Sequence, residues 1–186
     1  MTDAIPADTS RYNELPKIAI GGVVTGVLTP LLPDAIDLLA PAPAMLRLAL
    51  VALPFAALVF IVVRRRSTNP VWAAVVAAIV TMIAFVAAVN AAVYADGQMA
   101  SSAKAIRSLF AGLAGGLVGS AVMALGIALL PAGPRKSAAW MPMLVTGTVA
   151  GSLLALDTSL GLDRTSFLYP VWQAAIGVRL AMALRR

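Results

Sequence analysis

Apolar residues in this chain fall into six long blocks separated by short polar segments. The blocks show no polar face at 3.6-residue spacing, which is expected for helices surrounded by lipid rather than water. The pattern predicts an all-α integral membrane protein built as a bundle of six transmembrane helices. The six blocks are residues 18–32, 44–63, 70–94, 105–130, 138–156 and 167–184.

The blocks differ in how well they match the roughly 20 apolar residues that a spanning helix needs. Blocks two to five reach or nearly reach this length, whereas block six is slightly short. Block one is the shortest and would rise only about 22 Å. Pro30 and Pro33 interrupt its end. We therefore expect a short, broken first helix, and a re-entrant segment is the alternative.

Residues 1–17 are polar and mildly acidic, with Asp3, Asp8 and Glu14 among them. A cleaved secretory signal would instead begin with a basic region followed by a short apolar core. We predict a flexible cytoplasmic tail over residues 1–17. Residues 18–186 are then predicted to form one transmembrane domain.

The overall composition supports a membrane protein and argues against a nucleic-acid-binding one. Apolar residues make up 61% of the chain and charged residues only 12%, too few to cover a water-soluble fold. The net charge is +6, but the basic residues lie at block ends, in Arg64–Arg66, Arg135–Lys136 and Arg185–Arg186. Such positions are typical of membrane orientation signals. The expected partner is therefore the lipid bilayer, and no nucleic acid.

The same basic residues predict an orientation. If the loop with Arg64–Arg66 is cytoplasmic, alternation of six spans places both termini in the cytoplasm. The membrane is then predicted to be a bacterial-type inner (plasma) membrane. In this orientation the outer loops hold most of the acidic residues, namely Asp34, Asp37, Asp96, Asp157 and Asp163.

Several kinds of chemistry are excluded by residues that the chain lacks. It has no cysteine and no histidine, which removes the usual ligands of haem, zinc and iron–sulfur clusters and the usual general base. No carboxylate lies near the centre of a block, where a proton relay would need one. Ser120 has no base within plausible reach. We predict no catalytic site, no metal, no cofactor and no enzyme activity.

Small residues recur at four-residue spacing in three blocks, where they would let neighbouring helices approach closely. One interpretation is packing within the subunit. The other is contact with a second subunit through blocks four and five, in a homo-oligomer or a heteromeric membrane complex. The residues are Gly22, Gly26, Gly112, Gly115, Gly116, Gly119, Ser120, Gly147 and Gly151.

Few polar side chains fall within or beside the blocks, and such residues are candidates for function. Asp34, Arg47, Asn90 and Gln173 lie toward the predicted outer side, and we hypothesise that they line a polar vestibule. Arg179 is a candidate contact for an anion or a lipid headgroup. The alternative for both arginines is that their long stems carry the charge to the headgroup level.

The two halves of the chain share short sequence matches. Pro70-Val71-Trp72 reappears as Pro170-Val171-Trp172, and residues 21–33 resemble residues 119–131. Both matches map blocks one and three onto blocks four and six. They suggest a 3+3 inverted repeat, an architecture that small transporters use. Chance similarity between apolar segments is the alternative.

Two functions fit this pattern. The first is a small-solute permease or channel-like protein, favoured by the repeat and by the broken first helix. The second is an accessory or scaffold subunit of a larger membrane protein complex, favoured by the scarcity of ionisable groups. Convergence of the polar side chains on one cavity would favour the permease.

Overall fold

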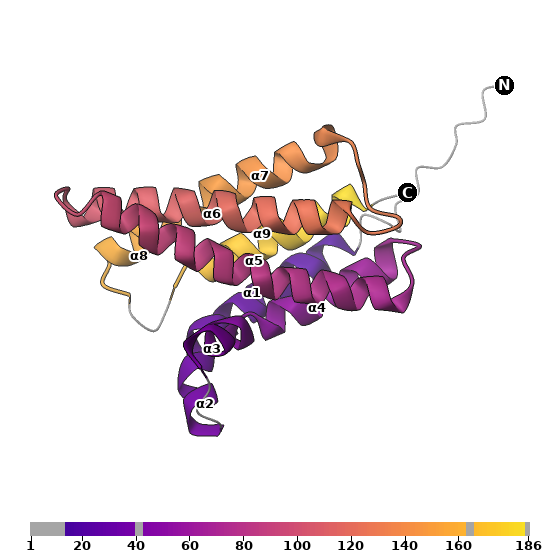
Figure 1. Cartoon of the computed structure of the whole chain (residues 1–186), viewed down its shortest axis with the longest axis horizontal. Coiled ribbons are helices and arrows are strands. Elements are labelled where there is room, and N and C mark those ends of the chain that lie inside the picture. The colour runs from indigo at the N-terminus through magenta and orange to yellow at the C-terminus, as the bar shows by residue number, and fades with distance from the viewer. Residues whose placement is uncertain (1–13, 40–42, 163–165, 185–186) are drawn as a thin grey trace.

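The computed structural model describes residues 14–39, 43–162 and 166–184. All regular elements among these residues are helices. Figure 1 shows most of them as an elongated bundle, with α2 and α3 projecting from it side by side. The elements are α1 (Leu15–Leu28), the 3-10 turn η2 (Thr29–Leu31), α2 (Leu32–Leu39), α3 (Ala44–Val51), α4 (Leu53–Arg66), α5 (Val71–Gln98), α6 (Lys104–Ala128), α7 (Ser137–Gly151), α8 (Leu153–Ser159) and α9 (Leu168–Ala183).

Four helical stretches in the described part of the chain are long and apolar enough to cross a membrane. The bent pair α3–α4 makes a fifth if it forms one span. These helices support a membrane location, as the sequence predicts. The last predicted span corresponds to α9, which has only 16 residues, so the total of six spans stays a prediction. The four stretches are Leu15–Leu38, Val71–Gln98, Lys104–Ala128 and Ser137–Ser159.

The first helical stretch is longer than the predicted block. Helical structure continues past Leu32 to Leu39, through η2 and α2. Proline is tolerated in the first turn of a helix, because the N–H it lacks would be unpaired there. Pro30 and Pro33 each fall at such a position, one in η2 and one in α2. The prolines therefore divide the stretch into shorter elements without ending it.

Two consecutive helix pairs, α3–α4 and α7–α8, are each separated by a break. Between α3 and α4 the helix axis bends by 50°, just before Pro54, which cannot donate a backbone hydrogen bond and disturbs the preceding turn. There the Ala52 amide bonds the Ala49 carbonyl at 3.1 Å. Between α7 and α8 the break falls at Ser152, whose hydroxyl donates to the Val149 carbonyl at 2.7 Å.

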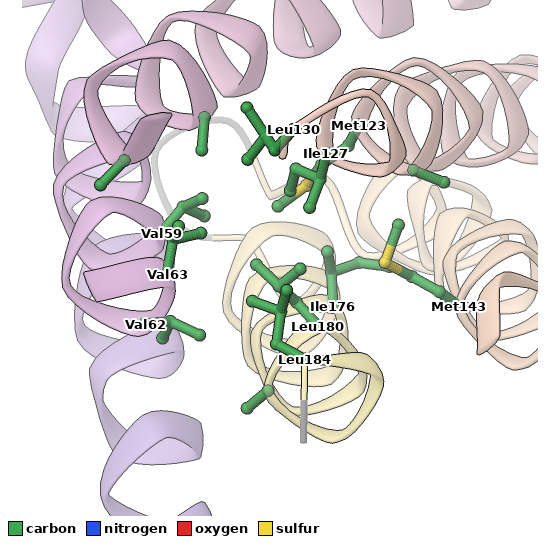
Figure 2. Close-up of a cluster of buried hydrophobic side chains, with 14 of the residues drawn as sticks. Val59, Val62, Val63, Met123, Ile127, Leu130, Met143, Ile176, Leu180 and Leu184 are labelled. Carbon is green, nitrogen blue, oxygen red and sulfur yellow. The ribbon is translucent and has the colours of Figure 1, made fainter. Parts of the chain in front are cut away.

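The longest helices, α5 and α6, form the most extensive helix pair. α1 packs against α9, α6 also packs against α7, and α4 packs against α5. Figure 2 shows the buried core that α4, α6, α7 and α9 build together. Its fully buried members include Met123, Ile127, Met143, Ile176 and Leu180.

One end of the bundle carries most of the described basic residues, and we call it the basic end. Glu14, just before α1, pairs with Arg66 at the end of α4 at 2.9 Å. Asn69 is 2% exposed and accepts a hydrogen bond from the Ala132 amide at 2.9 Å, so it fastens the α4–α5 loop to the α6–α7 loop. The last residues of α9 lie beside the same two loops. Both ends of the described chain thus lie at the basic end (Figure 1).

Candidate solute cavity

A cavity of about 180 Å³ lies between α5, α6, α9 and the α7–α8 break, in the half of the bundle opposite the basic end. We call it the central cavity. Its lining is almost entirely apolar, and Gln173 is its one amide side chain. The lining residues are Phe85, Ala88, Val89, Ala92, Val93, Ala111, Gly112, Gly115, Gly116, Gly151, Leu154, Leu168, Tyr169, Trp172 and Gln173.

Small residues on two of its walls help to leave the cavity open. α5 contributes Ala88 and Ala92, and α6 contributes Gly115 and Gly116. A Cβ at Gly115 would lie 3.0 Å from the Ala88 carbonyl oxygen, so the two backbones already lie close together. Because these positions carry little or no side chain, the space between α5 and α9 stays unfilled, unlike a normally packed interior.

Gln173 has a defined orientation at the cavity. It is 2% exposed, and its Nε2 donates to the Thr29 hydroxyl at 2.8 Å. Thr29 in turn donates its own hydroxyl proton to the Thr25 carbonyl at 3.0 Å. Thr29 can therefore only accept from Gln173, which fixes the amide with its NH₂ toward Thr29. Gln173 Oε1 is left buried, with no hydrogen-bond partner in the described part of the chain.

A second lining residue also carries a buried polar atom without a partner. Among the residues that the structure describes, Trp172 Nε1 has no hydrogen-bond partner, although indole N–H groups usually find one when buried. The Trp172 ring packs edge-on against Phe55, with ring centroids 5.9 Å apart. Buried polar groups are normally satisfied, so one acceptor and one donor without partners distinguish this region from the apolar core.

A second pocket, of about 270 Å³, adjoins the central cavity and is more polar. The two share Leu154, Leu168 and Tyr169 as lining residues. We call the second one the mouth pocket, because it lies farther from the basic end. Lys104 and Asp157 contribute its charged side chains.

Asp157 also holds the start of α9 in place. It is 4% exposed and accepts hydrogen bonds from the amides of Phe167 and Leu168, at 2.9 and 3.2 Å. Ser166 donates its hydroxyl to the same carboxylate. A carboxylate at the first amides of a helix is favourable both as a hydrogen-bond acceptor and as a negative charge. Asp157 thereby positions Tyr169 between the two pockets.

The side chains predicted to line a polar vestibule make separate contacts. Arg47 forms an ion pair with Asp37 at 2.8 Å, within the α2–α3 projection. Asn90 is exposed and donates to the Val86 carbonyl of its own helix at 2.8 Å. Only Gln173 lines the central cavity, and Asp34 is an exposed residue of α2. The contacts of the described residues do not join these four side chains.

Arg179 lies in the second half of α9 and donates through Nε to the Thr146 hydroxyl of α7 at 3.2 Å. It is partly exposed. One side of the guanidinium is thus held by a neighbouring helix. Whether the other side binds an anion or a lipid headgroup stays a prediction.

The glycines of α6 and α7 lie where the two helix backbones nearly touch. A Cβ at Gly112 would lie 2.0 Å from the Gly151 carbonyl oxygen, and one at Gly116 would lie 2.2 Å from the Gly147 carbonyl oxygen. Ser120 is fully buried and donates to the Gly116 carbonyl at 2.7 Å. In these positions the side of α6 that carries Gly112 and Gly116 is occupied by α7 of the same chain.

The glycines of α1 make an equally close approach to α9. A Cβ at Gly22 would lie 2.4 Å from the Cα of Ala174, and one at Gly26 would lie 2.4 Å from the Cα of Pro170. Gly119, on another side of α6, lies beside Ala88 and Trp172. Any side chain at Gly22 or Gly26 would push α1 and α9 apart, which is the physical reason for glycine at both positions.

Sequence reasoning missed most of the residues that give the cavity its chemistry. It did not single out Thr29, Trp172, Tyr169 or Phe85 as site residues, and only Gln173 was a candidate. Within the described part of the chain no group of acidic residues is arranged to hold a metal ion. No protein-family model, curated protein or solved structure matches the chain.

Proposed function

We propose that the protein is a small-solute permease or channel-like membrane protein, and that the central cavity binds its solute. One observation carries this proposal. Gln173 lines an apolar cavity inside a bundle of membrane-type helices, and its buried acceptor Oε1 has no hydrogen-bond partner among the described residues. Leaving such a group unsatisfied costs about 1–3 kcal/mol, and a bound solute would recover that energy.

The lining indicates the class of solute. An apolar cavity of about 180 Å³ is comparable to one that takes a single aromatic ring. Gln173 Oε1 calls for a hydrogen-bond donor on the solute, and Trp172 Nε1 calls for an acceptor. A hydroxyl or primary amide group on a small apolar body provides both. We therefore expect an uncharged amphipathic solute.

The two halves of the bundle fit one state of a transport cycle. The mouth pocket and the central cavity adjoin one another in the half away from the basic end. Toward the basic end, the fully buried Met123, Met143 and Ile176 fill the space between α6, α7 and α9 (Figure 2). An access route on one side and a packed barrier on the other is the arrangement that alternating access requires.

The pattern of helix contacts supports the proposed inverted repeat. In the sequence matches, α1 corresponds to α6 and α5 corresponds to α9. α1 packs on α9, just as α6 packs on α5. If α4 corresponds to α7, the contact of α4 with α5 likewise corresponds to that of α7 with α9. Exchanging the two halves thus preserves the main helix pairs.

A non-enzymatic role is part of this proposal. Ser120, the one serine considered as a nucleophile, is fully buried, and its hydroxyl donates to carbonyls of its own helix. With no cysteine or histidine in the chain, the cavity has no general base of the usual kind. Binding and passage of a solute require neither.

An accessory subunit is the second candidate, and the α2–α3 projection favours it. The two short helices pack on each other and extend from the bundle (Figure 1). Leu38, Met45 and Leu46 are 87%, 63% and 52% exposed there. In a heteromeric complex this projection, rather than the glycine sides of α6 and α7, would supply the contact with another membrane subunit.

The proposed orientation places the basic end in the cytoplasm of a cell with a bacterial-type inner membrane. It is supported by the positive-inside tendency, since Arg64, Arg65, Arg135 and Lys136 lie in or beside loops at that end. Because both ends of the described chain lie at the basic end, both would be cytoplasmic. The mouth pocket would then open toward the outside.

Thiol accessibility tests the permease without requiring that its solute be identified. Because the chain has no cysteine, single variants Ala88→Cys and Leu180→Cys can be made in the native background. Ala88 lines the central cavity, and Leu180 lies in the fully buried core. A membrane-impermeant thiol reagent is applied to vesicles of either orientation. Gly97→Cys and Lys136→Cys, at opposite ends of the bundle, serve as controls for sidedness.

For a permease we expect Ala88→Cys to react from the side of the mouth pocket, and Leu180→Cys to react slowly from the basic side as the core opens. An accessory subunit would leave Leu180→Cys unreactive from both sides.

Phenol and toluene, which are similar in size, then test the cavity. Phenol should stabilise the purified protein more than toluene, and Gln173→Leu should abolish the difference. Val89→Phe, which fills the cavity, should abolish both effects, whereas Val86→Phe should preserve them.

A further inference from the structure

A groove of about 150 Å³ lies between the start of α1 and the end of α4, at the basic end. It is separate from the central cavity and shares no lining residue with it. Its floor is apolar and consists of Ile18, Leu58, Ile61 and Val62. Its rim carries charged side chains.

The rim is predominantly basic. Lys17, Arg65 and Arg66 line it together with one acid, Glu14. Glu14 forms an ion pair with Arg66 at 2.9 Å, so the one carboxylate among the described rim residues is already engaged. Lys17 and Arg65 are both exposed. Among the described residues no ion pair joins either of them to a carboxylate. The rim therefore presents two positive charges beside an apolar floor.

The floor is closed at its deeper end by helix packing. A Cβ at Gly21 would lie 3.0 Å from the Leu58 side chain, so α1 and α4 meet there. From Leu58 to Arg66 the groove follows α4 for about 12 Å, at 1.5 Å per residue. Ile61 is 46% exposed on its side. A chain molecule could lie along this floor while its head remains at the rim.

We propose that this groove binds one anionic phospholipid, with the phosphate between Lys17 and Arg65 and the first part of an acyl chain over Leu58 and Ile61. A free anion would gain nothing from the apolar floor, and a zwitterionic lipid would gain less from two positive charges. Basic pockets between helices at a membrane surface are suited to acidic headgroups. The site requires only that the helices lie in a membrane, and it is independent of the solute proposed for the central cavity.

The test uses the full chain purified in a neutral detergent, with phosphatidylglycerol and phosphatidylcholine of identical acyl chains. Native mass spectrometry should show one phosphatidylglycerol retained, and thermal unfolding should shift upward with that lipid only. The Lys17→Gln/Arg65→Gln variant should lose the preference by roughly thirtyfold, the product of two contributions typical of basic side chains at an anionic surface. The matched variant Arg135→Gln/Lys136→Gln removes equal charge at the same end, outside the groove, and should retain it.

Ile61→Trp keeps every charge and fills the floor, so it should also lose the preference. Its unfolding temperature without lipid, measured alongside those of the two double variants, separates lost binding from lost folding. Equal retention of both lipids would overturn the proposal. An equal loss in both double variants would do the same, because it would indicate a diffuse charge effect. Stabilisation by inorganic phosphate alone, as strong as that by phosphatidylglycerol, would replace the lipid site with a soluble-anion site.

Discussion

The two halves of this bundle are both apolar inside but are packed in opposite ways. Toward the basic end, long flexible and branched side chains such as Met123, Met143 and Ile176 fill the space between α6, α7 and α9 (Figure 2). In the other half, alanine and glycine on α5 and α6 leave the central cavity open. Side-chain size along a helix, rather than apolarity, therefore decides which half is filled and which half keeps a cavity.

The largest expected effect is at Gly116, which lines the cavity in the loosely packed half and yet has no room for a side chain. Gly116→Leu would drive a side chain into the Gly147 carbonyl, which already lies 2.2 Å from a Cβ at this position. Overpacking costs 1–3 kcal/mol, occasionally more, and a rigid backbone neighbour places this case at roughly 3 kcal/mol or above. The readout is the yield and thermal unfolding of monodisperse protein. Gly97→Leu is the control, since a Cβ there meets nothing within 4 Å, and equal behaviour of the two variants would refute the close approach.

Two methionines of α7 allow the stability contributed by the packed core to be compared with that contributed by the surface. Met143 is fully buried and Met141 is 54% exposed. Met143→Ala should lower the free energy of unfolding by about 2–5 kcal/mol, the usual range for a buried large-to-small change. Met141→Ala should change it by less than about 0.5 kcal/mol. Reversible unfolding in mixed micelles measures both. Similar values for the two would mean that the basic half is not a tightly packed barrier.

A smaller effect is expected at the Gln173–Thr29 hydrogen bond, which ties α9 to η2 beside the cavity. Interhelical hydrogen bonds in membrane proteins contribute about 0.6 kcal/mol on average. Thr29→Val should destabilise more than Gln173→Leu, because it leaves the buried Gln173 NH₂ without an acceptor. A double-mutant cycle gives the coupling energy directly. A coupling of zero would show that the bond does not hold α9 in place.

The smallest effect is expected at the exposed ion pair of the α2–α3 projection. Arg47 and Asp37 have side chains 43% and 47% exposed, and pairs of this kind contribute less than about 1 kcal/mol. Arg47→Gln should therefore change thermal unfolding only slightly, and less at high salt. A large loss of stability that is restored by Asp37→Asn in the same chain would show that the projection is a structural part of the bundle.

The helices could be predicted from the apolar blocks because each block is long and bounded by polar or proline-rich segments. The first helix was predicted too short, since proline marks the start of a new helical element as readily as the end of an old one. The breaks at Ala52 and Ser152 were not predicted. The break at Ala52 lies beside Pro54, within an apolar block. The break at Ser152 lies within a block that has no proline or charged residue at that point.

The site could be predicted only in part. An apolar block does not reveal how its helix is rotated, so the partner of Gln173, Thr29, which lies 144 positions earlier, could not be identified. The ion pair of Arg47 with Asp37 is local, because the two residues lie on consecutive short helices, and it could have been anticipated from their closeness in the sequence. A usable signal for the cavity was present, because Ala88 and Ala92 on α5 lie opposite Gly115 on α6. Whether small residues on two facing helices let the helices touch or leave a cavity depends on the other helices that pack there, here α9 and the α7–α8 break.

The glycine contacts have a consequence for how this molecule can move. Backbone against backbone, α1 is locked to α9 at Gly22 and Gly26, and α6 is locked to α7 at Gly112 and Gly116. Between these two locked pairs the contact is made by side chains, with Ile176 of α9 lying against Gly147 of α7. Side chains can change rotamer and slide, whereas touching backbones cannot. The α1–α9 pair and the α6–α7 pair are therefore expected to move as two rigid units. They would slide along the side-chain contacts between α7 and α9, which lead to the cavity.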